Sequence, residues 1–95
     1  MIVHWTETAA AHLVAIYEHI ARDSPQYALR MVDRITQRSS QIGSVPSSGR
    51  AVPEYDAGDI REVIEGSYRI IYCVRTDRVD VLAVVHGARR LPPTA

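Results

Sequence analysis

The sequence predicts an α+β fold in which an N-terminal strand and an antiparallel helix hairpin pack on a mainly antiparallel four-stranded sheet. Apolar residues in the first half recur with a helical period, whereas the second half consists of β-rich runs separated by tight turns. The chain has 95 residues, of which 46% are hydrophobic and 23% charged. These values are ordinary for a globular protein, so we expect residues 1–95 to form a single domain.

The first half is expected to contain one strand and two helices. Ile2 to Trp5 is a short apolar-rich segment typical of a strand, and Thr6 or Thr8 can cap the helix that follows. Ser24-Pro25 is a cap followed by a proline in the first helical turn, so a second helix begins within a few residues and must run antiparallel to the first. We expect it to end at Gly43. The expected buried stripes are Leu13, Ile16, Tyr17 and Ile20 in the first helix, and Ala28, Met31, Val32, Ile35 and Ile42 in the second.

Residues 44–58 read SVPSSGRAVPEYDAG and show no periodicity. Fifteen residues make a long connection for so small a domain, and long loops often carry function. The alternative is a packed surface crossing pinned by Val45, Val52 and Tyr55.

Three β-rich runs follow, from Asp59 to Glu65, from Tyr68 to Arg75 and from Val79 to His86. Two-residue turns at Gly66-Ser67 and Thr76-Asp77 would join them into an antiparallel meander. Alternation then predicts a face for the helix hairpin, made of Arg61, Val63, Tyr68, Ile70, Tyr72, Val74, Val79, Val81, Ala83 and Val85. It predicts a second, uncovered face made of Ile60, Glu62, Ile64, Arg69, Ile71, Cys73, Asp80, Leu82, Val84 and His86.

Composition excludes several classes of protein. Eleven basic and eleven acidic residues cancel, which disfavours bulk nucleic-acid binding, and all eleven basic residues are arginines. A single cysteine, Cys73, rules out an internal disulfide and a cysteine-rich zinc site, and we expect no metal and no cofactor. The sequence has neither a signal-peptide pattern nor an apolar run long enough to span a membrane, which favours the cytoplasm.

Candidate functional residues gather near the end of the chain. Arg69 and His86 are expected on adjacent strands of the uncovered face, with Arg89 and Arg90 following the flexible Gly87. Such a set could grip a phosphate while the histidine moves a proton, as metal-free RNA cleavage requires. The alternative is structural: Arg69 pairs with Glu62 or Asp80 across the sheet, and His86 fills the end of the strand.

The sequence resembles the RelE/ParE toxins of type II toxin–antitoxin systems over almost its whole length. The segments that carry the resemblance are SPQYALRMVDRI (24–35), GRAVPE (49–54), IREV (60–63), YRIIY (68–72) and HGARRLP (86–92). The resemblance implies the fold described above and a role in plasmid stabilisation. Arg69 and Arg89 match positions that RelE-like nucleases use to hold phosphate. If the chain were a nuclease, its catalytic residues would be Arg69, His86 and Arg89.

Departures from the RelE pattern favour the ParE branch of the family. The lysine pair of RelE falls on Ile60 and Glu62, and the C-terminal tyrosine of the nucleases has no counterpart in LPPTA. A missing general acid or base typically costs about 10²- to 10⁴-fold in rate. We therefore expect a toxin that inhibits DNA gyrase by protein–protein contact without catalysis of its own. The alternatives are a ribosome-dependent mRNA endonuclease and a decayed scaffold that only binds its antitoxin.

The resemblance also implies partners. A cognate antitoxin is expected to fold on this chain as an amphipathic helix or an added strand, with acidic residues facing Arg69, Arg89 or Arg90. Gyrase is the expected target, with the ribosome and mRNA as the alternative. We expect neither membrane contact nor sequence-specific DNA binding. The residues expected to recognise the target or the antitoxin are Arg61, Arg69, His86, Arg89 and Arg90.

Overall fold

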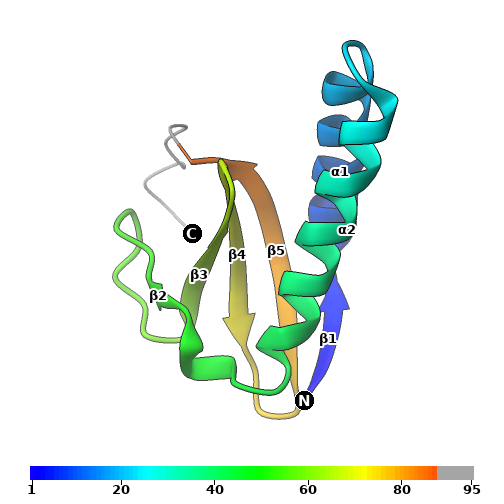
Figure 1. Ribbon diagram of the computed structural model, residues 1–95. Coiled ribbons are helices and arrows are strands. Elements are labelled where there is room, and N and C mark those ends of the chain that lie inside the picture. The colour runs from blue at the N-terminus through cyan, green and yellow to red at the C-terminus, as the bar shows by residue number, and fades with distance from the viewer. Residues whose placement is uncertain (88–95) are drawn as a thin grey trace.

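The computed structural model describes residues 1–87. Its elements are β1 (Ile2–Trp5), α1 (Glu7–Ala21), α2 (Pro25–Ile42), a short 3₁₀ helix η1 (Pro46–Ser48), β2 (Arg50–Ala51), β3 (Ile60–Glu65), β4 (Tyr68–Val74) and β5 (Arg78–His86). The strands form one sheet in the order β1-β5-β4-β3-β2, in which only the β1–β5 pair is parallel (Figure 1). The predicted α+β fold is confirmed, but the sheet has five strands instead of four because the long loop contributes β2.

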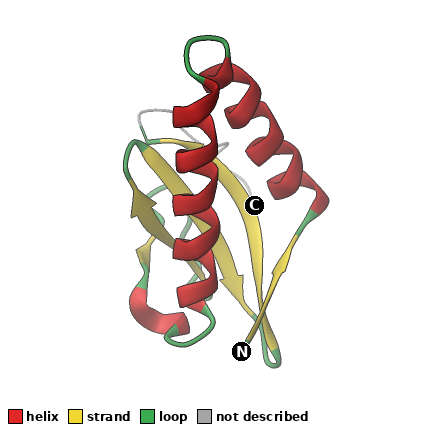
Figure 2. Ribbon diagram, turned by 45° about the vertical axis from the view of Figure 1, so that its right-hand side comes forward, coloured by secondary structure: helices red, strands yellow, loops and turns green. Residues whose placement is uncertain are grey.

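The helix hairpin begins and turns where the sequence indicates. The hydroxyl of Thr6 accepts a hydrogen bond from the backbone N–H of Ala9, so Thr6 and not Thr8 is the N-cap of α1. The hydroxyl of Ser24 accepts from the N–H of Tyr27 in the same way, and Pro25 is the first residue of α2. Both helices lie on one face of the sheet, and the tip of the hairpin projects beyond the sheet (Figures 1 and 2).

The two predicted hairpin turns are also confirmed. Glu65 pairs with Tyr68 across the Gly66-Ser67 turn, and Val74 pairs with Val79 across a turn that contains Thr76 and Asp77. Gly66 has a φ of 58°, a left-handed conformation that glycine adopts without steric cost.

The predicted faces of β5 are right in its first half and wrong in its second. The register shifts by one residue: Tyr72 pairs with Val81 and Ile71 pairs with Ala83, which leaves Leu82 as the extra residue of a β-bulge. Every later side chain of β5 therefore points to the face opposite to the one predicted for it. Val84 joins the core under the helices, while Val85 packs with Ile71 on the other face.

The bulge separates Arg69 from His86. Arg69 alternates with Ile70, which packs under the helices, so Arg69 lies on the face away from them. His86 pairs with Tyr68 and its ring meets the tyrosine ring edge to face, at 5.8 Å between centroids, on the helix side of the sheet. The prediction that these two side chains share one face is wrong.

The long loop covers much of the second face of the sheet, although Ile64 on that face stays 45% exposed. Val52 is 1% exposed and packs with Ile71 and Val85, and Tyr55 packs against this cluster. Val45, the third predicted anchor of the loop, is instead 53% exposed. The segment from η1 to β3 thus packs against this face of the sheet. The larger core lies on the other side, between the sheet and α1 and α2.

Asp80 links the outer strand to the sheet through charge. Its carboxylate accepts hydrogen bonds from Arg78 (2.8 Å) and Arg75 (3.1 Å) and lies 3.1 Å from the Nδ1 atom of His4 on β1. The hydrogen bond from Arg78, followed by those from Arg75 and His4, lowers the pKa of Asp80 from 3.8 to about 2, although burial opposes the shift.

This shift predicts a specific loss of stability in acid. Because the folded-state pKa lies below the unfolded one, the contribution of Asp80 is fully present above about pH 5 and is lost as the pH falls through about 2. We expect Asp80→Asn to lower the melting temperature at pH 7 and to flatten its decline between pH 5 and pH 2. Asp77→Asn is the control, because Asp77 is 77% exposed and its carboxylate comes no closer than 4.0 Å to the guanidinium of Arg78. If the melting temperatures of wild type and Asp80→Asn fall equally between pH 5 and pH 2, Asp80 is not the source of this acid sensitivity.

Candidate functional site

Arg69 is the centre of a buried charge network on the loop-covered face. Its Nε atom donates to Glu62 at 2.7 Å, and its two terminal nitrogens donate to the two carboxylate oxygens of Glu54 at 2.9 and 2.8 Å. Arg50 donates from the other side to Glu62 at 2.7 Å. The side chains of Arg69 and Glu62 are 7% and 0% exposed, so this network is part of the interior.

In this network the positive charge of Arg69 is paired with the carboxylates of Glu54 and Glu62. The two-pronged hydrogen bond to Glu54 matches the planar geometry of a guanidinium and a carboxylate. The hydrogen bond from Glu54 raises the pKa of Arg69, burial opposes this, and Glu62 adds to the rise. The structural alternative, in which Arg69 pairs with Glu62, is therefore confirmed, and Glu54 is an additional partner supplied by the GRAVPE segment.

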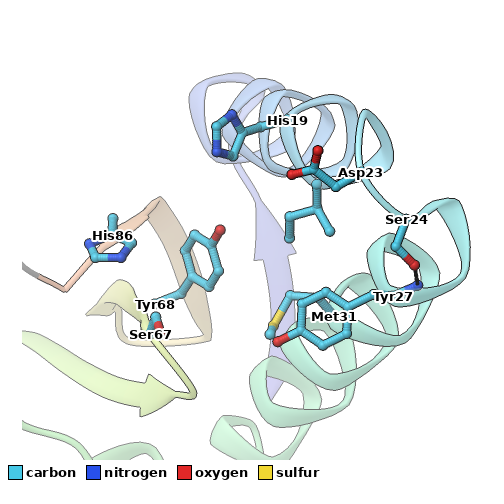
Figure 3. Close-up of a pocket in the computed structure, with 9 residues that line it drawn as sticks. His19, Asp23, Ser24, Tyr27, Met31, Ser67, Tyr68 and His86 are labelled. Carbon is cyan, nitrogen blue, oxygen red and sulfur yellow. Dashed lines mark hydrogen bonds between the residues drawn. The ribbon is translucent and has the colours of Figure 1, made fainter.

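His86 lies on the opposite face, beside a groove between the helix hairpin and the sheet. Two adjoining hollows of about 380 and 370 Å³ share His19, Tyr68 and His86 in their walls. One wall of the groove comes from the helix hairpin and the other from the ends of β4 and β5 (Figure 3). The remaining lining residues are His12, Ala15, Ile16, Ile20, Asp23, Ser24, Tyr27, Met31, Ser67, Val84 and Val85.

The groove combines an apolar floor with titratable groups at its rim. Its apolar lining includes the buried Met31 and the half-buried Ile20, while His19 and Asp23 come from the hairpin and Tyr68 from the sheet (Figure 3). Burial raises the pKa of Tyr68, and the nearby Tyr27 adds to the rise, so its hydroxyl stays protonated and can donate a hydrogen bond at neutral pH. Such a surface can accept a largely apolar segment that carries a few polar groups.

Sequence reasoning missed the histidines of α1. The Nδ1 atom of His12 accepts a hydrogen bond from the N–H of Val84 at 3.2 Å, two residues after the bulge at Leu82, so His12 faces the sheet. His19 lies seven positions later on the same side of the helix. That i, i+7 spacing was a signal available in the sequence.

The predicted recognition residues do not form one cluster. Arg61 pairs with Tyr72 near the far end of β4 from Tyr68, and its guanidinium donates to the carbonyl of Gly49 at 2.9 Å. Arg69 lies under the loop, and His86 lies at the groove. Arg89 and Arg90 fall outside the described residues.

Residues 1–87 contain no group of three or more histidine, cysteine or acidic side chains placed to hold a metal ion. No helix in this part of the chain has the length and apolar character needed to cross a membrane.

A helix hairpin on one face of a small sheet, with an open groove between the hairpin and the ends of β4 and β5, defines a small α+β domain. The ParE toxin family of the type II toxin–antitoxin system parDE matches residues 3–91. A solved structure of a chromosomal ParDE toxin–antitoxin system from P. aeruginosa aligns with a TM-score of 0.75 and 25% identity, covering 90% of this chain and 95% of that one. No curated protein matches the sequence significantly.

The chain therefore belongs to the ParE toxin family of type II toxin–antitoxin systems. The resemblance to ParE drawn from the sequence segments is confirmed. Membership of this family also implies that the toxin has an antitoxin partner.

Proposed function

We propose that this ParE-family toxin inhibits DNA gyrase by protein–protein contact and does not cleave RNA. The observation that carries the proposal is the burial of Arg69 between Glu54 and Glu62. A phosphate would have to displace one of these carboxylates and open the covering loop to reach the guanidinium. Breaking a buried pair in this way typically costs several kcal/mol.

The position of His86 supports the same proposal. An arginine and a histidine that act on one phosphodiester must converge within hydrogen-bond reach of it. Here the sheet lies between them, since Arg69 is on the loop-covered face and His86 is at the groove. A protein whose residues 1–87 do not bring Arg69 and His86 together is better suited to act by binding. We place its action in the cytoplasm, where gyrase works.

An assay of gyrase activity tests the proposal. Purified toxin added to gyrase and relaxed plasmid should block supercoiling or trap cleaved DNA, and the cognate antitoxin should restore activity. In a translating extract, the same toxin concentration should leave the pattern of ribosome stalling and mRNA cleavage unchanged. Unaltered supercoiling at saturating toxin, together with new cleavage in ribosome-bound mRNA, would replace this proposal with the nuclease alternative.

We also propose that the groove accepts the antitoxin. Its walls offer apolar surface beside polar rim groups, as a docked amphipathic segment requires. The role in recognition that we predict for His86 fits this position. For Arg61, which lies outside the groove, and for Arg89 and Arg90, recognition of the target or the antitoxin stays a prediction.

Tyr27 provides a test of antitoxin docking. It is 41% exposed and lines the groove, and a tyrosine at the centre of an interface contributes about 2 kcal/mol or more. We expect Tyr27→Asp to weaken antitoxin binding about 30-fold or more in a calorimetric titration. Leu29→Asp is the matched control, because Leu29 is also exposed on α2, at 56%, but does not line the groove. Equal losses in both variants would place the antitoxin elsewhere.

A further inference from the structure

A row of three arginines runs along the exposed side of α2. Arg30, Arg34 and Arg38 follow one another at intervals of four residues, which places successive side chains about 6 Å apart along the helix axis. Arg30 and Arg34 are exposed and Arg38 is half-buried. We refer to these three residues as the arginine row.

The charge of the arginine row is not neutralised within the described part of the chain. Arg50, Arg69, Arg75 and Arg78 each have a carboxylate within 4.0 Å, whereas no residue among 1–87 supplies one to any arginine of the row. Asp33 is the only acidic residue of α2, so three arginines and one aspartate leave that helix with a charge of +2. The helix α1 contains Glu7 and Glu18 and no arginine. The neutral chain therefore carries a local excess of positive charge on α2.

The surroundings of the row supply further hydrogen-bond donors. Gln26, Gln37 and Gln41 lie among the arginines on the exposed side, and Arg38 donates to the amide oxygen of Gln41 at 3.5 Å. Protein–protein interfaces are usually centred on apolar or aromatic anchors. On this side of α2 the exposed large apolar residues are Tyr27, whose ring lies 5.9 Å from the guanidinium carbon of Arg30, and Leu29. Arginine and glutamine side chains are typical donors to phosphate oxygens.

We propose that the arginine row binds the phosphodiester backbone of duplex DNA. The contact reads no bases, so it agrees with the expected absence of sequence-specific DNA binding. The inference deepens the proposed function, and the role of this DNA contact in the cell rests on it. A toxin bound to gyrase lies close to the DNA that gyrase holds. The arginine row would then give the toxin a higher affinity for the gyrase–DNA complex than for gyrase alone.

The number of arginines sets the expected salt dependence. Binding that neutralises three phosphates gives a slope of about −2.7 in log affinity against log salt concentration. Raising the salt from about 50 to 200 mM should therefore weaken duplex binding about 40-fold. Isolated toxin should bind DNA weakly.

The test is fluorescence polarisation of a labelled 20-base-pair duplex titrated with the purified full chain at several salt concentrations. The variant Arg30→Gln/Arg34→Gln/Arg38→Gln should bind at least tenfold more weakly at low salt, with a slope near zero. The control is Thr8→Glu/Ala10→Glu/Ala11→Glu, which lowers the net charge by the same three units at exposed positions of α1. The control should retain the wild-type slope, and thermal melting should show that both variants are folded.

Each other outcome has a definite meaning. If both variants lose affinity equally, only net charge matters and the proposal is wrong. If the glutamine variant keeps its duplex affinity but loses antitoxin affinity, the row is a protein contact and the proposal is again wrong. If wild-type toxin binds the duplex through the row but leaves gyrase unaffected, the proposed function fails while the DNA contact stands.

Discussion

Replacing Arg69 by methionine is expected to lower the free energy of unfolding by about 3–5 kcal/mol, because it leaves buried carboxylates without their main partner. Glu62 is fully buried and would retain only Arg50, while Glu54 is 12% exposed and would lose both of its hydrogen bonds from Arg69. Chemical denaturation monitored by circular dichroism measures the loss. A decrease below about 1 kcal/mol would mean that the network contributes little to stability.

A compensating variant separates the loss of the arginine from the burial of its partners. Replacing a whole buried ionic group by residues of similar size is often close to neutral. Glu54→Gln/Glu62→Leu/Arg69→Met should therefore recover much of the stability that Arg69→Met loses. Arg50, whose side chain is 65% exposed, can return to solvent. If the triple variant is less stable than Arg69→Met alone, the carboxylates have partners that matter more than Arg69.

This prediction affects how functional experiments on Arg69 should be interpreted. A substitution that unfolds the toxin abolishes toxicity whatever the normal role of the side chain. Loss of activity in an Arg69 variant is therefore evidence of phosphate binding only if the variant melts at the wild-type temperature.

Gly49→Ala is expected to destabilise the protein by about 1–3 kcal/mol through overpacking. A Cβ atom on Gly49 would lie 2.7 Å from the backbone carbonyl oxygen of Glu62 and still closer to the hydroxyl of Tyr72. That hydroxyl accepts from the N–H of Gly49 at 2.9 Å and donates to the carbonyl of Pro46 at 2.7 Å, so it cannot move without losing both bonds.

Gly58→Ala is the matched control for this prediction. Gly58 belongs to the same loop, and an added Cβ would meet no atom within 4 Å. Its substitution should be neutral or slightly stabilising, since alanine restricts the unfolded chain more than glycine does. Equal midpoints of urea denaturation for the two variants would show that the loop relaxes around Gly49 at no cost.

Local signals accounted for most of the fold. Thr6, Ser24 and Pro25 are cap residues whose effect acts within one helical turn, and Gly66 marks a turn that its own backbone conformation requires. The bulge at Leu82 left no such signal. The sequence Leu82 to Val85 is apolar throughout, so it fits either face, and only the pairing with β4 decides which residue is extra.

The candidate site was less predictable than the fold. A partner for Arg69 could be foreseen in Glu62, because the two residues flank a tight hairpin on adjacent strands. Glu54 reaches Arg69 only because the loop folds back over the sheet, and no periodicity in the loop indicated this path. The sequence predicts that the face of the sheet with Arg69 is open, but the loop covers Arg69 and its partners there. The open groove lies on the other face, beside the helices.

The parallel pairing of β1 with β5 bears on how the protein is made. His4 and Asp80 are 76 positions apart in the chain but in direct contact, so β1 can join the sheet only after residues 78–81 of β5 have been synthesised. Contacts between distant positions slow folding, and synthesis proceeds at about 5–20 residues per second. A newly made toxin therefore spends several seconds on the ribosome before its outer strand β1 can pair with β5.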